Sequence, residues 1–170
     1  MKLRAATEKD LPQLKAVYET IIRHMEENGL RIWDEVYPCI CFPGDIENRR
    51  LYILEENREI LSAFALCDTH TGSAQVTWRD GQAKALYIDR LGVNAAHQKK
   101  GIGSAALQHA IRLAKEQGAE YVRLFVVDSN TPAIGLYRKN GFSQAGGIYA
   151  EVIDKSLTLR EFGFEIETAR

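Results

Sequence analysis

The stretch that decides the fold is LYIDRLGVNAAHQKKGIGS, residues Leu86 to Ser104. An apolar strand runs into a short polar loop, and the loop opens through Gly101-Ile102-Gly103 into a helix. The first backbone N–H groups of a helix lack intrahelical partners, and the helix dipole is positive there, so anions are favoured. Lys99 and Lys100 add positive charge at the rim. The segment therefore predicts an anion site suited to a phosphorylated ligand.

Size and composition restrict the class of protein around this segment. The chain has 170 residues, which suits a single domain spanning residues 1–170. Its 22 Lys and Arg against 23 Asp and Glu give a net charge of −1, without the basic excess of nucleic-acid binders. The chain contains no apolar run of the ~18 residues that span a membrane, and its N-terminus lacks the apolar core of a signal peptide. We therefore expect a cytoplasmic protein with neither nucleic acid nor a membrane as partner.

The three cysteines do not predict a metal site. Cys39, Cys41 and Cys67 cannot all pair with one another, because their number is odd. Cys39 and Cys41 are one residue apart, too close for a CxxC zinc half-site, and no matching Cys or His pair follows. We expect reduced thiols that serve in packing, and no metal.

Hydrophobic periodicity predicts a chain of alternating strands and helices. Strands are expected at residues 2–6, 51–55, 59–66, 84–93, 121–127, 142–150 and 157–166. Helices are expected at residues 11–28, 102–117 and 132–140, with one further helical turn at 45–49. Two consecutive β-α-β crossovers, from 84 to 127 and onward to 142, imply a mixed sheet with helices on both faces.

Local signals place several boundaries along this chain. Thr7 with Asp10 reads as a capping box for the first helix. Thr131 is the expected N-cap of the last helix, with Pro132 in its first position. Residues 69–82 are rich in Thr, Gly, Ser and Asp and predict a mobile excursion.

The loop after Leu86–Val93 differs from two common phosphate loops. A Walker loop requires Lys directly after its second glycine, whereas Gly103 is followed by Ser104. A dinucleotide fingerprint requires a third glycine and a place after the first strand, and this loop has Ala106 and lies in mid-chain. Glycines that merely tighten a turn would not explain the two lysines and the glutamine clustered beside them.

A third kind of loop fits. Gln98-Lys99-Lys100-Gly101-Ile102-Gly103 resembles the pyrophosphate loop, Q/R-x-x-G-x-G/A, of the GNAT superfamily of N-acetyltransferases. Residues 128–142, DSNTPAIGLYRKNGF, resemble the second signature of that family, and residues 3–11 and 51–66 also fit. The resemblance covers nearly the whole chain. It implies an α/β (α+β) fold: a mixed, mostly antiparallel sheet of about seven strands, splayed at its central parallel strands, with helices on both faces.

The resemblance also implies roles for individual residues. In such a site the strand before the loop contacts the pantetheine arm and acetyl group of acetyl-CoA, and the loop backbone holds the pyrophosphate. Asn130 is expected to hydrogen-bond the pantetheine arm, and Tyr137 to protonate the departing thiolate. A glycine inside a strand indicates a bulge or the close approach of a ligand, which is how we interpret Gly92. The cofactor-binding residues expected on this basis are Leu91, Gly92, Val93, Gln98, Lys99, Lys100, Gly101, Ile102, Gly103, Ser104, Asn130 and Tyr137.

The general base is left open by the sequence. Asp89 and Tyr87 alternate onto the same strand face as Leu91 and Val93, so either could accept the proton of the amine, directly or through water. Asp89 is our first candidate, although pairing with Arg90 or Lys84, or exposure to solvent, would also account for it. Three other side chains are weaker candidates for the base or for a covalent nucleophile: His24, Tyr37 and Cys67. His97 precedes the loop on the cofactor side and reads as an exposed neighbour of the phosphates.

The resemblance therefore implies an enzyme that transfers acetyl from acetyl-CoA directly to a primary amine of a small molecule, an amino acid or a peptide. Trp33, Tyr37 and Trp78 are candidates to line the acceptor pocket, although scattered aromatic residues more often serve in packing. The alternative is a non-catalytic CoA-binding sensor. Residues 161–166 predict an exposed strand edge, through which a homodimer could form.

Overall fold

The computed structural model describes residues 1–169, which form two compact units. The first unit comprises residues 1–66 and 90–109, and the second comprises residues 67–89 and the chain from residue 110 on. One strand, β4 (Ala85–Val93), contributes its first five residues to the second unit and its last four to the first.

Strands and helices lie close to the positions that the sequence predicts. The strands are β1 (Lys2–Ala5), β2 (Leu51–Glu56), β3 (Glu59–Cys67), β4, β5 (Tyr121–Val127), β6 (Ser143–Gln144), β7 (Tyr149–Val152) and β8 (Thr158–Glu167). The helices are α1 (Leu11–Glu27), α2 (Phe42–Glu47), α3 (Ile102–Glu116) and α4 (Thr131–Lys139). Four short 3-10 turns complete the chain: η1 (Glu8–Asp10), η2 (Cys39–Cys41), η3 (Ser73–Gln75) and η4 (Ala95–His97).

The strands form one eight-stranded sheet in the order β1-β2-β3-β4-β5-β8-β6, with β7 paired to β8. β4 and β5 pair in parallel, and their register runs from Ala85↔Tyr121 to Ile88↔Leu124. The mixed, mostly antiparallel sheet is therefore confirmed, with eight strands where about seven were expected.

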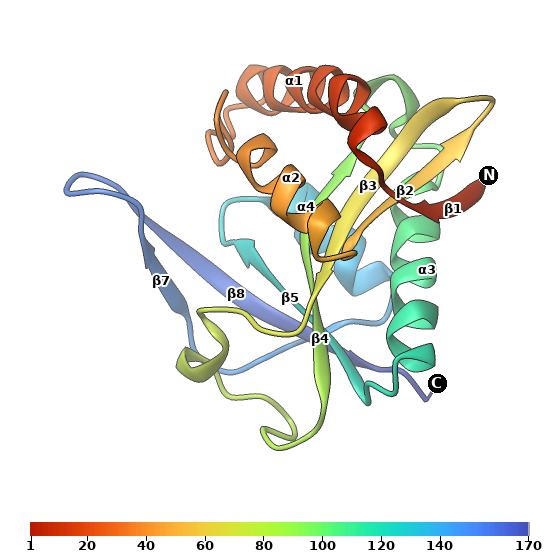
Figure 1. The fold of residues 1–170 in the computed structure, drawn as a ribbon. Helices are drawn as coiled ribbons and strands as arrows, with labels where there is room; N and C mark the ends of the chain where they lie inside the picture. Colours follow the sequence, from red (N-terminus) through yellow and green to blue (C-terminus); the bar gives the residue numbers. More distant parts are fainter. Residues whose placement is uncertain (170) are drawn as a thin grey trace. The chain divides into compact units, whose positions relative to one another are not determined.

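In the first unit, β1, β2 and β3 pair antiparallel, and α1 lies beside these strands (Figure 1). The turn between β2 and β3 is made by Asn57 and Arg58, which both have positive φ, as a two-residue hairpin turn requires. The buried face of α1 has the spacing of an amphipathic helix and consists of Leu14, Val17, Tyr18, Ile21 and Ile22.

The predicted start of α1 is confirmed. The carboxylate of Asp10 accepts the Thr7 N–H at 2.7 Å, and Arg4 donates to the same carboxylate at 2.7 and 2.8 Å. The Arg4 guanidinium lowers the pKa of Asp10 to about 2, against the opposing effect of partial burial. The helix ends at Asn28, and Gly29 follows with φ +77°.

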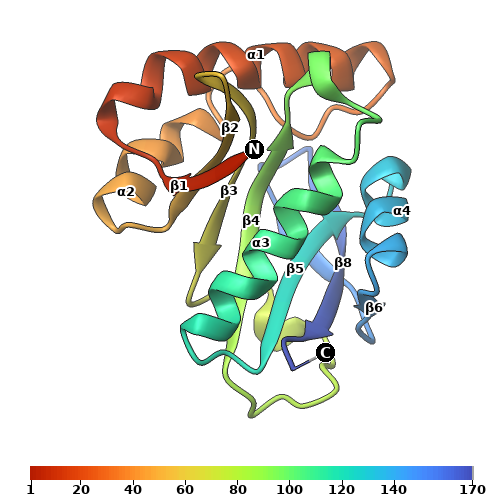
Figure 2. The same cartoon turned by 90° about the vertical axis from the view of Figure 1, so that its right-hand side faces the viewer.

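In the second unit, β5 and β8 share a seven-residue antiparallel register, and β8 also pairs with β6 and β7. Figure 2 shows α4 beside the short strand β6. Tyr137 of α4 packs near Phe142 and Phe164, with ring centroids 6.1 Å away in each case. These contacts hold the helix against the sheet.

The second predicted crossover is present, because β5 and β6 each pair antiparallel with β8, which lies between them, and so run in the same direction on either side of α4 in the chain. Two other predictions about the second unit are wrong. The single strand expected at 142–150 is broken into β6 and β7, with Gly147 at φ +82° between them. Residues 161–166 are not a free edge, because β8 is paired on both sides and Phe164 is fully buried.

The start of α4 and the segment before β4 also differ from expectation. Asn130, not Thr131, is the N-cap, since its side chain accepts the Ala133 N–H at 3.3 Å. Residues 69–82 are tied down: Trp78 is only 8% exposed, and its indole N–H donates to the Ser73 carbonyl at 2.9 Å. Polar composition predicted mobility here, but one buried aromatic ring anchors the segment.

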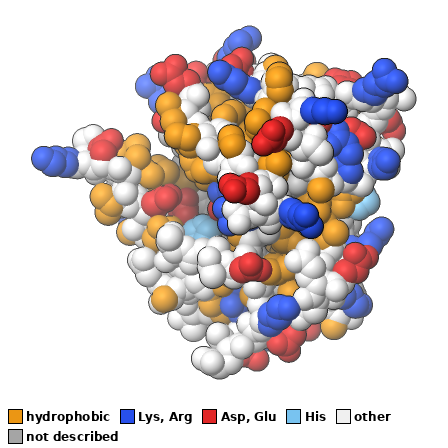
Figure 3. All heavy atoms as spheres, viewed as in Figure 1, with side chains coloured by type: hydrophobic (Ala, Val, Ile, Leu, Met, Phe, Trp, Pro, Cys, Tyr) orange, Lys and Arg blue, Asp and Glu red, His pale blue; other side chains and the backbone are white. Residues whose placement is uncertain are grey.

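Charged side chains of both signs are interspersed on the face drawn in Figure 3. None of the helices within residues 1–169 is long and apolar enough to cross a bilayer. Over that same range, no three His, Cys, Asp or Glu side chains gather in a way that could hold a metal ion.

Candidate active site

The predicted anion loop in the first unit is anchored at its start by Asn94. The buried side chain of Asn94 donates to the Ile60 carbonyl at 3.0 Å and accepts the Ala96 N–H at 3.1 Å. The backbone N–H of Asn94 donates to the Leu61 carbonyl. The bonds to Ile60 and Leu61 attach the chain to β3 just before the loop, and the bond with Ala96 holds the turn that follows Asn94. The loop therefore begins from a fixed point.

The conformation of the loop follows from two left-handed residues. Lys99 has φ +60° and Gly101 has φ +78°. A Cβ on Gly101 would meet nothing within 4 Å, so glycine is required by its φ and leaves open space beside the loop. Lys99 and Lys100 are exposed. The loop therefore presents positive charge and unobstructed backbone together.

The helix after the loop is held firmly. Ile102 is buried against Leu54 and Leu61, and the Ala105 N–H makes the first helical bond to the Gly101 carbonyl at 3.0 Å. The N–H groups before Ala105 therefore belong to the helix start, where an anion is favoured. This is the geometry that the glycine pattern predicts.

His97 is not simply an exposed neighbour of the loop. Its Nε2 lies 2.8 Å from Oε1 of Glu59 on β3, and its side chain is 22% exposed. The contact adds a second link between η4 and β3.

The end of β4 explains Gly92 differently from expectation. A Cβ on Gly92 would lie 2.8 Å from the ring of Tyr18 and 2.9 Å from Ile21, both on α1. The close approach comes from α1 packing, and the left-handed residue in this strand is Arg90, at φ +54°. The Gly92 carbonyl accepts the Ser62 hydroxyl at 2.7 Å. The glycine is thus accounted for without a ligand.

The two predicted catalytic residues belong to the second unit and interact electrostatically. Tyr137 is buried, and burial together with the negative charge of Asp89 raises the pKa of its phenol well above 10. The phenol therefore stays protonated over the whole physiological range. It is a hydrogen-bond donor and a weaker acid than a solvated tyrosine.

Two carboxylates that the sequence did not single out join Asp89. Glu151 on β7 and Glu161 on β8 share a side-chain hydrogen bond, and the Asp89 charge acts on both. Burial, followed by the charges of Glu151 and Asp89, raises the pKa of Glu161 to about 8. Burial also raises the pKa of Glu151. We call Asp89, Glu151 and Glu161 the carboxylate cluster.

Three further candidates lie elsewhere in the first unit. The His24 ring is 3.5 Å from the Asn28 side chain at the end of α1. Trp33 stacks on Tyr18 with ring centroids 5.6 Å apart, so it serves in packing. Tyr37 is 37% exposed.

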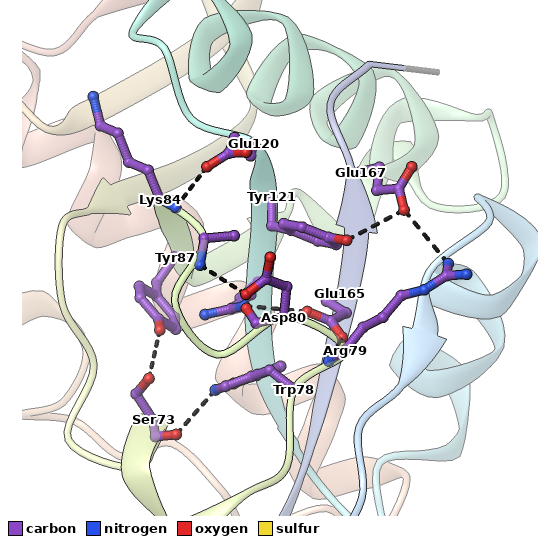
Figure 4. Close-up of polar contacts among 12 residues, drawn as sticks. Ser73, Trp78, Arg79, Asp80, Lys84, Tyr87, Glu120, Tyr121, Glu165 and Glu167 are labelled. Carbon is purple, nitrogen blue, oxygen red and sulfur yellow. Dashed lines mark hydrogen bonds and ion pairs between the residues drawn. The ribbon is translucent and has the colours of Figure 1, made fainter.

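Trp78 belongs to a packed network in the second unit (Figure 4). The guanidinium of Arg123 lies 4.5 Å above the Trp78 ring and donates to Glu165 at 3.2 Å, both charged groups being buried. Glu165 also accepts the Arg79 N–H at 2.6 Å. Trp78 therefore fixes residues 68–84 to β5 and β8.

Comparison with known proteins identifies the family. Residues 31–142 match the model of the acetyltransferase (GNAT) family. The chain is 30% identical over 170 residues, covering 98% of itself and 99% of the relative, to YwnH of Bacillus subtilis, named as a candidate phosphinothricin acetyltransferase. It is 28% identical over 149 residues, 85% of itself and 81% of the relative, to the L-methionine sulfoximine/L-methionine sulfone acetyltransferase of Pseudomonas paraeruginosa.

A solved structure shares the fold. It is the acetyltransferase yncA of Salmonella typhimurium, determined with acetyl-CoA, which superposes with a TM-score of 0.71 at 18% identity over 99% of this chain and 94% of that one. Nothing in these similarities favours the non-catalytic sensor. The chain belongs to the acetyltransferase (GNAT) family and is an N-acetyltransferase that transfers acetyl to an amine.

Proposed function

We propose that this enzyme takes acetyl from acetyl-CoA and transfers it directly to the primary amine of a small molecule, with free amino acids as the favoured class. The observation that carries the proposal is the loop of residues 98–104, anchored by Asn94 and left-handed at Lys99 and Gly101, in a chain of the GNAT family. Acetyl-CoA bound to the structural neighbour yncA supports the choice of donor.

In this proposal the loop binds the pyrophosphate. The backbone from Gln98 to Ser104, through Ile102 and Gly103, supplies N–H donors, and Lys99 and Lys100 supply charge. Open space beside Gly101 lets phosphate oxygens approach the backbone.

The end of β4 orients the acyl end of the donor. We assign Leu91, Gly92 and Val93 to the pantetheine arm and the acetyl group, and a backbone donor there would stabilise the oxyanion of the transition state. The Asn130 side-chain oxygen is engaged in capping α4, and we propose that its amide N–H group binds the pantetheine arm.

Tyr137 is proposed as the general acid. When the amine nitrogen attacks the carbonyl carbon, the C–N bond forms, the C–S bond breaks, and the phenol gives its proton to the departing thiolate. Burial keeps the phenol protonated until that moment. The raised pKa by itself opposes proton transfer from the phenol. The negative charge that develops on the departing thiolate beside it favours that transfer.

The amine must lose a proton, and a carboxylate of the second unit is the proposed acceptor. Asp89 remains the first candidate, because it is the carboxylate that acts electrostatically on Tyr137. Glu161 is the second, because a pKa of about 8 is closer to that of an ammonium than the pKa of an ordinary glutamate.

The acceptor class rests on the relatives. L-methionine sulfoximine and L-methionine sulfone, which one relative's name gives as its substrates, are amino acids with a primary amine. We further propose that residues 1–170 act as a single GNAT domain in the cytoplasm, without a metal. A homodimer is the proposed assembly, with no nucleic acid or membrane as partner.

The test follows thiol release from acetyl-CoA with a panel of amino acids, polyamines, peptides and aminoglycosides, beside calorimetric binding of acetyl-CoA. We expect turnover with one or more free amino acids and binding in the micromolar range. Acetyl-CoA binding with no turnover on any amine would contradict the proposed acceptor chemistry, and no binding would contradict the donor.

A further inference from the structure

The second half of β4 is held by side chains of the first unit. The buried Tyr18 hydroxyl donates to the Arg90 carbonyl at 2.6 Å, and the buried Ser62 hydroxyl donates to the Gly92 carbonyl at 2.7 Å. Two carbonyls of β4, two residues apart, are thus fixed by side chains from α1 and β3. The strand at this point is positioned by more than sheet pairing.

Arg90 is the unusual residue of this strand. Its φ of +54° lies in the left-handed region, which non-glycine residues rarely adopt inside a strand. A residue in that conformation changes the direction of the strand and the face on which later side chains lie. Leu91, Gly92 and Val93 follow it directly. The backbone direction of these three residues therefore depends on Arg90.

The Arg90 side chain has a specific anchor. Its Nε donates to Oδ2 of Asp45 at 2.8 Å and its Nη2 donates to Oδ1 at 2.9 Å, a bidentate arrangement. The Asp45 side chain is fully buried and that of Arg90 is 8% exposed. Buried, bidentate Arg–carboxylate pairs fix geometry in a way that exposed ion pairs do not. A strained backbone persists only where its surroundings hold it.

We propose that Asp45 on α2 is a positioning residue for acetyl transfer, because through Arg90 it holds the left-handed turn of β4 that aims the Leu91–Val93 backbone. The inference rests on the proposed function, which assigns that backbone to the acetyl group and the pantetheine arm. Neither side chain needs to touch the substrates. A small displacement of the aligned backbone lowers the rate because the reacting atoms are no longer in line.

Arg50 provides a matched control. Its Nε donates to Oδ1 of the same Asp45 carboxylate at 2.7 Å, but Arg50 precedes β2 and lies outside β4. Arg50→Met and Arg90→Met each remove one arginine from one carboxylate. Only the second removes the anchor of β4.

The experiment measures kcat, KM for acetyl-CoA, the Kd of CoA and the thermal midpoint for Arg90→Met, Arg50→Met and Arg90→Gly. We expect Arg90→Met to lower kcat by about 10- to 100-fold. The Kd of CoA should change by less than about threefold, because the loop is anchored separately by Asn94. Arg50→Met should keep kcat within about threefold. Arg90→Gly, which adopts positive φ without strain, should recover much of the kcat lost in Arg90→Met.

Equal loss of kcat in Arg50→Met and Arg90→Met, or no loss in Arg90→Met, would overturn the inference. If Arg90→Met does not fold, Arg90→Lys, which keeps the charge but loses the bidentate contact, replaces it: a kcat lower than that of Arg50→Met supports the positioning role, and equal values refute it. Failure of the proposed function looks different, since the unmodified enzyme itself would then neither bind acetyl-CoA nor release thiol.

Discussion

The loop of residues 98–104 and the carboxylate cluster of Asp89, Glu151 and Glu161 are built in opposite ways. The loop is one continuous segment whose backbone conformation depends on Lys99 and Gly101. The cluster joins side chains from β4, β7 and β8, more than 60 residues apart in the chain at its widest. A backbone site leaves a local glycine pattern, whereas a side-chain site of this kind leaves none. We expect the two regions to divide the work, with binding of acetyl-CoA depending on the loop and chemistry on the second unit.

The largest expected effect is on chemistry in the second unit. Tyr137→Phe should lower kcat by about 10²- to 10⁴-fold, because the departing thiolate loses its proton donor. The Kd of acetyl-CoA, measured by calorimetry, should stay nearly the same. Tyr121→Phe is the control, because the Tyr121 hydroxyl donates to Glu167 in the packed network at the start of β5, away from Tyr137 in the chain. An unchanged kcat in Tyr137→Phe would remove the tyrosine from the mechanism.

The next largest effect is on binding in the first unit. Gly101→Val should weaken acetyl-CoA binding about 100-fold, because two hydrogen bonds to a charged group together contribute about 3 kcal/mol. Gly29→Val is a matched control: Gly29 has φ +77°, and its Cβ would also meet nothing within 4 Å. Both variants should lose a similar amount of stability, about 1–2 kcal/mol from left-handed strain. Equal binding by the two variants would mean that the loop does not hold the pyrophosphate.

A third prediction separates the two candidate bases. Asp89→Asn should lower kcat/KM about 10²-fold, and Glu161→Gln by less than about tenfold, if Asp89 accepts the proton. Asp89→Asn also removes a negative charge that raises the pKa values of Tyr137 and Glu161, so both should fall toward their ordinary values. The pH dependence of kcat/KM checks the assignment. The reverse order of the two losses would assign the base to Glu161.

The smallest effect concerns stability. The folded pKa of Glu161 is about 8, above its ordinary 4.5, so unfolding releases its proton between these values. Its contribution is favourable below pH 4.5 and is lost as pH rises through 8. Glu161→Gln should therefore match the unmodified protein near pH 4.5 and exceed its Tm by about 3 °C at pH 8.5, for roughly 1 kcal/mol after solvent screening.

The control for this titration is Glu116→Gln, which changes an exposed carboxylate at the end of α3. Its Tm should follow the unmodified protein at every pH. A constant Tm difference between Glu161→Gln and the unmodified protein across the pH range would show that Glu161 is ionised normally in the folded state.

The sequence by itself determined the features that depend on local geometry. Glycine and proline positions, apolar periodicity and caps placed β5 at its observed bounds and α1 and α3 within a residue of theirs. The Gln98–Gly103 pattern predicted a glycine-containing anion loop before a helix, because glycine lets a ligand approach the backbone closely. The family followed from the same motif together with residues 128–142.

Only the tertiary structure decided what depends on contacts between distant segments. It paired β8 with strands on both sides, although the apolar pattern of β8, interrupted by two glutamates, predicted an exposed edge. It packed Tyr18 against Gly92, and it paired Asp45 with Arg90, which lies 45 residues further along the chain. It brought Glu151 and Glu161 together beside Asp89. These contacts follow from strand register and helix packing. Both depend on the free energy of the whole chain, and neither leaves a periodic signal in the sequence of the residues that come into contact.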